Sequence, residues 1–79
     1  MSMLVDYARR VAETKGIQHK TYLSMLRSYI KATPEKYLIP VIKQISNPNV
    51  LRALWEAGLN ATLQQAVAER LNELGIVRG

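Results

Sequence analysis

The chain contains no cysteine, so neither a disulfide nor a thiolate-bound metal can reinforce its fold. This absence matters because the chain has only 79 residues. A domain of about this size buries roughly 60% of the surface that its unfolded chain exposes. We therefore expect one domain, residues 1–79, of modest stability and in a reducing compartment such as the cytoplasm.

Long apolar runs are also missing, which argues against a membrane protein. The run from Tyr37 to Ile42 is far shorter than the roughly 20 residues that a membrane-spanning helix needs. The first residues, MSMLVDYARR, lack the basic region and the apolar stretch of a secretion signal. A hydrophobic content of 48% is nevertheless too high for a disordered tail. The sequence predicts a folded cytoplasmic protein without a membrane segment.

Residues that commonly carry chemistry are few. The one histidine, His19, has no carboxylate near it in the sequence. Glu69 and Glu73 are four residues apart, but no histidine shares their helix face, and Arg70 lies between them. The chain has no glycine-rich phosphate loop. We therefore predict no catalytic residue, no metal site and no cofactor.

Apolar residues recur instead at spacings of three and four, which predicts helices. The expected helices run from Met3 to Lys15, from Gln18 to Ala32, from Pro34 to Ile45, from Pro48 to Ala57 and from about Asn60 to Leu74. No stretch alternates apolar and polar residues for long enough to predict a strand. Because the connections are short, consecutive helices should pack as neighbours. The expected fold is a compact all-α domain of five helices in short hairpins.

Capping residues and glycines mark the ends of these helices. Gly16, Gly58 and Gly75 follow the last helical residues of three of them. The expected N-caps are Ser2, Thr33, Ser46 or Asn47, and Asn60 or Thr62, with Gln65 completing a capping box on Thr62. Pro40 should kink the third helix without ending it. Leu54, Leu71 and Trp55 are expected in the core.

Charge is unevenly distributed along the chain. Residues 1–43 have eight Lys or Arg against three Asp or Glu, whereas residues 44–79 have three of each. Helical spacing puts Lys20, Arg27 and Lys31 in one column that faces water, with Lys15 and Lys36 beyond its ends. Such a surface is typical of polyanion binding and equally of a solvated face that keeps a small protein soluble. The four tyrosines all lie in the basic half and also have two interpretations. Their rings can be half-buried on the flanks of helices, or they can stack on the unpaired bases of a nucleic acid.

The first two helices also resemble a helix-turn-helix motif. Ala12, Gly16-Ile17, Tyr22 and Met25 fall where that motif has a small residue, a turn glycine with an apolar follower, and two core positions. The resemblance implies that the second helix enters the major groove of DNA with residues 18–21 at its leading end. The alternative is a plain helix–glycine–helix corner. The candidate nucleic-acid contacts are Gln18, Lys20, Thr21, Arg27 and Lys31.

The stretch KYLIPVIKQISNPNVLRALWEAG resembles a HEAT-type helical repeat. Pro40 stands where that family has a kinking proline, Asn47-Pro48 stands at the turn, and Leu51-Arg52 near the start of the second helix is similar to its apolar–arginine pair. ATLQQAVAERLNELG then looks like the second helix of another unit, with Leu63-Gln64 at the corresponding position. The alternative is a generic small helical bundle. The resemblance covers about half the chain and implies a non-catalytic protein-binding role.

A short array of this kind should leave part of one apolar face uncovered. A chain of 79 residues holds at most two such units, whereas an array normally needs about three or more to bury its core. We therefore expect a homodimer or another protein partner, and nucleic acid as the alternative partner. The residues expected at a protein interface are Val50, Leu51, Ile76 and Val77.

Overall fold

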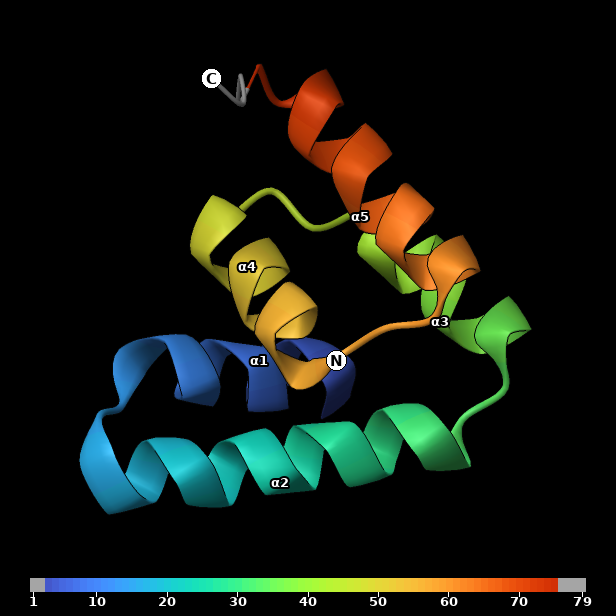
Figure 1. Cartoon of the computed structure of the whole chain (residues 1–79). Coiled ribbons are helices and arrows are strands. Elements are labelled where there is room, and N and C mark those ends of the chain that lie inside the picture. Colours follow the sequence, from blue (N-terminus) through green and yellow to red (C-terminus); the bar gives the residue numbers. More distant parts are fainter. Residues whose placement is uncertain (1–2, 76–79) are drawn as a thin grey trace.

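The computed structural model describes residues 3–75, which form five helices and no strand (Figure 1). The helices are α1 (Met3–Glu13), α2 (Gly16–Ala32), α3 (Glu35–Ile42), α4 (Pro48–Ala57) and α5 (Ala61–Glu73). The prediction of a compact all-α fold of five helices is confirmed for this part of the chain.

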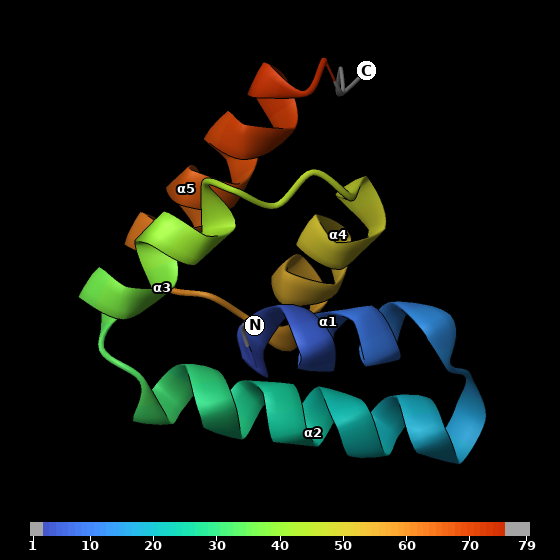
Figure 2. The same ribbon diagram turned by 180° about the vertical axis from the view of Figure 1, so that it is seen from behind.

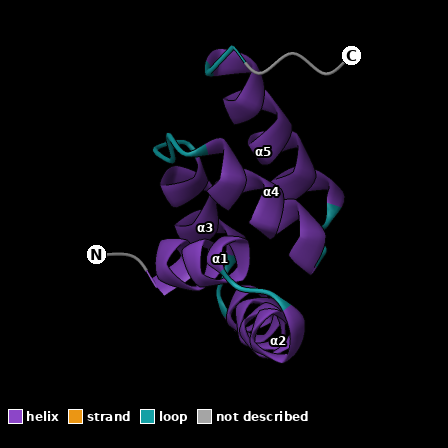
Figure 3. Cartoon of the chain, turned by 90° about the vertical axis from the view of Figure 1, so that its left-hand side faces the viewer, coloured by secondary structure: helices purple, strands orange, loops and turns teal. Residues whose placement is uncertain are grey.

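The first two helices, α1 and α2, run side by side in opposite directions, which Figure 1 shows from the side and Figure 3 along their axes. Only Thr14 and Lys15 separate them. Gly16 permits the reversal because its φ is +68°, a left-handed conformation that glycine adopts at little cost. α2 is the longest helix, yet Leu26 is its only fully buried residue. It therefore lies at the edge of the molecule and exposes most of its surface.

The central helix is α4, which packs on α1, α2 and α5. Five of its ten residues are buried: Val50, Leu51, Ala53, Leu54 and Ala57. The short helix α3 packs on α5 and less on α1, and it is not among the close neighbours of α4 (Figure 2). The expected hairpin of the third and fourth helices therefore does not form. Instead, the linker between them lies against α5, because Ile45 is buried and its carbonyl accepts a hydrogen bond from Arg70 Nε at 2.7 Å.

One hydrophobic core extends through all five helices. Its fully buried larger side chains are Leu4, Val11, Leu26, Ile42, Leu51, Leu54 and Val67. Leu54 and Leu71 are buried as predicted, and no polar or charged residue is buried among residues 3–75. Trp55 is a correction, because it is 40% exposed. It follows Leu54 directly, so helical geometry turns it about 100° from Leu54 and places it beyond the margin of the face that α4 buries.

The third helix is shorter than its apolar spacing predicts. It begins at Glu35 and ends at Ile42, so it continues through Pro40 but does not reach Ile45. Thr33 does not cap it: the N-cap residue is Pro34, and the Thr33 hydroxyl donates instead to Tyr29 O at 2.7 Å. The Lys43 and Gln44 backbone N–H groups bond to carbonyls of α3 and so close it with a turn.

The last two helices, α4 and α5, each begin with a side-chain cap. Asn47 Oδ1 accepts from Asn49 N–H at 2.9 Å, and Asn60 Oδ1 accepts from Leu63 N–H at 2.9 Å. Asn60 therefore takes the place of the expected capping box on Thr62. Gly58, at φ +91°, ends α4 as predicted. Ser2 lies outside the described residues.

Candidate nucleic-acid interface

The candidate interface is the side of α2 that faces away from the core. Leu26 is buried on the inner side, and Leu23 and Ile30 are half-buried beside it. We define the outer face of α2 by six exposed residues: Lys20, Thr21, Ser24, Arg27, Ser28 and Lys31. The helix α2 itself lies at the edge of the molecule (Figure 1).

The three cations of this face stand on one flank of it. Their offsets of seven and four residues keep them within about 40° of one another around the helix and spread them over about 16 Å of its axis. α2 contains no acidic residue. Lys20 and Lys31 have no ion-pair partner within residues 3–75, where the ion pairs involve other cations. The positive charge of this flank is therefore not neutralised by that part of the chain.

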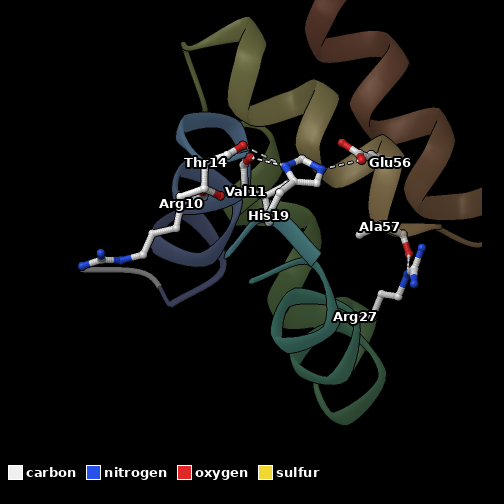
Figure 4. Close-up of polar contacts among 7 residues, drawn as sticks. All are labelled: Arg10, Val11, Thr14, His19, Arg27, Glu56 and Ala57. Carbon is white, nitrogen blue, oxygen red and sulfur yellow. Dashed lines mark hydrogen bonds and ion pairs between the residues drawn. The ribbon is translucent and has the colours of Figure 1, made fainter. Parts of the chain in front are cut away.

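Arg27 has a structural role as well, which the sequence did not indicate. Its Nε donates a hydrogen bond to Ala57 O at 2.9 Å (Figure 4). Ala57 is the last residue of α4, so the guanidinium meets the carbonyl end of that helix, where the helix dipole favours a cation. Arg27 is exposed on the predicted column and in addition fastens α2 to α4.

We expect Arg27→Gln to lower the free energy of unfolding by about 1 kcal/mol, because it removes a charge-assisted hydrogen bond from a partly exposed site. Lys31→Gln is the matched control, since it removes the same charge from the same flank without breaking a contact. Its effect should stay within about 0.5 kcal/mol. Urea denaturation measures both, and equal effects would show that the bond to Ala57 does not stabilise the fold.

A second polar contact joins α2 to two other helices through His19. Its Nδ1 lies 2.9 Å from Val11 O and 3.1 Å from Thr14 O, and its Nε2 lies 2.7 Å from Glu56 Oε2 (Figure 4). Both ring nitrogens are thus engaged within the protein. The hydrogen bond to Glu56 raises the pKa of His19 above its ordinary value of 6.5, and burial opposes this shift. Sequence inspection missed Glu56 as a partner because 37 residues separate the two.

The helix-turn-helix interpretation does not agree with the arrangement of α1 and α2. That motif joins its helices at about 90–120°, whereas these two are antiparallel (Figure 3). Of its expected inward positions, Ala12 and Met25 are exposed, and Ile17 is 84% exposed. The motif is absent because α2 turns Leu23, Leu26 and Ile30 inward instead. Gln18 and Thr21 remain exposed, but helical spacing places Gln18 far from the cationic flank.

A groove lined by charged, aromatic and methionine side chains follows the seam between α1 and α2 on the other flank of α2. Its hollow of about 510 Å³ is lined by Met3, Asp6, Tyr7, Arg9, Arg10, Glu13, Tyr22 and Met25. The Arg10 guanidinium lies over the Tyr22 ring, 5.7 Å from its centroid, and Tyr7 meets Tyr29 edge-on. Those three tyrosines are half-buried as expected, while Tyr37 is exposed. Because their rings are partly covered, they offer less surface to bases than the sequence suggested.

Two of the four residues predicted at a protein interface are buried in the fold. Val50 is 3% exposed and Leu51 is fully buried, so neither presents a surface to a partner. They are buried because α4 lies at the centre of the fold rather than at its edge. Ile76 and Val77 lie outside the described residues.

Metal-binding and membrane-spanning features are not found in residues 3–75. No group of three or more His, Cys, Asp or Glu side chains there is placed to hold a metal ion. No helix in that range combines the length and the hydrophobicity needed to cross a membrane.

Comparison with protein-family models, with curated proteins and with solved structures finds no match to this chain. Its function has to be argued from its own residues.

Proposed function

We propose that this chain is a non-catalytic binding module that holds the phosphate backbone of a nucleic acid against the outer face of α2. The observation that carries the proposal is a 17-residue surface helix without any carboxylate, on which Lys20 and Lys31 have no ion-pair partner among the described residues. A solvated face that served only solubility would need no such separation of charge, because mixed charges keep a protein soluble as well.

The dimensions of this face suit a nucleic-acid backbone. The cations cover about 16 Å of the helix axis, and phosphates of one strand follow each other every 3.4 Å or so along a duplex. About five phosphates therefore lie within reach of the flank. Ser24 and Ser28 stand on the same face and have no hydrogen-bond partner for their side chains in the described part of the chain. Their hydroxyls can donate to phosphate oxygens, which positions a backbone without reading its sequence.

Binding of the wild-type protein to labelled duplex and single-stranded pools, followed by fluorescence anisotropy, tests the proposal. If about three phosphates are neutralised, affinity for duplex should fall about 40-fold between about 50 and 200 mM salt. Sequence should have little effect, since the face contacts phosphates. Failure to bind either pool at low ionic strength would eliminate nucleic acid as the ligand. Binding to anionic vesicles or acidic proteins alone would assign the cationic flank to another partner.

A protein partner, or a second copy of the chain, is the second candidate, and the groove along the α1–α2 seam favours it. Met3 and Met25 are among the few large hydrophobic side chains exposed in residues 3–75, and both line this groove. Flexible methionines suit a surface that receives apolar side chains. The resemblance of residues 36–75 to HEAT-type repeats also implies protein binding, but it is a resemblance of sequence only, because α3 and α4 are not close neighbours.

A further inference from the structure

His19 is placed so that each of its ring nitrogens meets only hydrogen-bond acceptors. Nδ1 faces the carbonyl oxygens of Val11 and Thr14 at the end of α1, and Nε2 faces the carboxylate of Glu56 in the last turn of α4 (Figure 4). A neutral imidazole has one N–H, so it can satisfy one side only. The imidazolium has two and satisfies both.

Few charged groups surround the imidazole ring of His19. A hollow of about 200 Å³ beside it is lined by Thr14, Asn49, Arg52, Glu56 and apolar residues. α1 contributes no charged side chain to this lining, and α4 contributes Arg52 and Glu56. Arg52 opposes the imidazolium, but its guanidinium is directed to Asn49 Oδ1 at 3.5 Å. On α2 itself, Lys20 adjoins His19 and also opposes it.

The hydrogen-bond acceptors on the two sides of the imidazole ring differ in how easily they can move away from it. The acceptors on α1 are backbone atoms, which the helix end holds in place, and they belong to its negative dipole end. The Glu56 carboxylate stands on a long side chain that is 48% exposed and can turn into water. Loss of one proton therefore breaks the contact with Glu56 and leaves the contact with α1.

We propose that His19 is a proton-operated clasp: as imidazolium it ties α2 to both α1 and α4, and on losing the Nε2 proton it releases α4 alone. The clasp does not depend on what the outer face of α2 binds. A second side-chain bond between these two helices, from Arg27 to Ala57, does not involve His19.

The direction of the pH effect follows from the raised pKa of His19. A group whose pKa is higher in the folded than in the unfolded protein stabilises the fold fully below its unfolded value. That contribution disappears as the pH rises through the folded pKa, which lies above 6.5. The clasp is therefore closed in mildly acidic solution and open in alkaline solution.

NMR titration of uniformly ¹⁵N-labelled protein tests this, because the chain has a single histidine and gives one pair of imidazole nitrogen signals. We expect a pKa above 6.5 in wild type, a neutral form with its proton on Nδ1, and a lower pKa in Glu56→Gln. Amide signals of the last turn of α4 should titrate with the same midpoint in wild type and lose this response in Glu56→Gln. Glu69→Gln, which removes the same charge from an exposed site on α5, is the matched control and should leave the titration unchanged.

Three outcomes would overturn the clasp. They are a His19 pKa at or below 6.5 in wild type, a neutral form protonated on Nε2, and equal pKa values in Glu56→Gln and Glu69→Gln. Unfolding curves provide an independent readout. The stability difference between wild type and Glu56→Gln should be present in mildly acidic solution and should vanish as the pH passes the titration midpoint. A difference that is constant with pH would contradict the proposal.

Discussion

Leu54→Ala should destabilise the domain by about 2–5 kcal/mol. Leu54 is fully buried on α4, the helix that packs on α1, α2 and α5. Truncation there removes apolar contacts at the centre of the fold and leaves a cavity that the neighbouring helices cannot all close. A chain of this length has a total stability of roughly 4–12 kcal/mol, so the loss is a large share of it.

Ile17→Ala is the matched control for this prediction. It also shortens an aliphatic side chain on a helix, but Ile17 is 84% exposed. Its effect should stay within about 0.5 kcal/mol. Thermal and urea unfolding followed by circular dichroism measure both variants. A loss below about 1 kcal/mol for Leu54→Ala would mean that α4 is not the centre of the core.

The double variant Lys20→Gln/Lys31→Gln should lose most of the affinity for nucleic acid without losing stability. Each lysine that contacts a phosphate releases counterions on binding, so removing two should reduce the slope of log affinity against log salt by about 1.8 for duplex and about 1.4 for single strands. Stability should change little, since neither side chain has an ion-pair partner in the described residues. Arg27 is left unchanged here because its substitution would also loosen α2 from α4.

The control for net charge is Lys43→Gln/Arg52→Gln, which neutralises two exposed cations outside α2. Binding driven only by the overall charge of the protein would weaken equally in both double variants. A ligand that lies on the outer face of α2 would distinguish them, because only Lys20 and Lys31 belong to that face. Anisotropy measured across a salt series decides between these results.

Local sequence signals predicted the features that depend on neighbouring residues. Asn47 and Asn60 cap their helices because a short polar side chain reaches the N–H groups of the residues that follow it. Leu54 and Leu71 are buried because helical spacing repeats their positions on one face. The cations of α2 share a flank for the same reason.

Contacts between distant parts of the chain could not be derived in this way. His19 meets Glu56, and Arg27 meets Ala57, because α2 and α4 happen to pack together, and neither pair has a signature in the sequence. The same limit explains Val50 and Leu51. Their apolar spacing indicated a buried face, but only the packing of α4 shows that the fold itself covers that face.

The two sides of α2 leave its residues with unequal freedom to vary in evolution. Lys20, Ser24, Ser28 and Lys31 support neither the core nor a bond to another helix among the described residues, so selection can adjust affinity there without a penalty in folding. Arg27 belongs both to the outer face and to the joint with α4. Substitutions at Arg27 therefore change both affinity and stability. We expect homologues to keep an arginine at this position and to vary more in the charged residues around it.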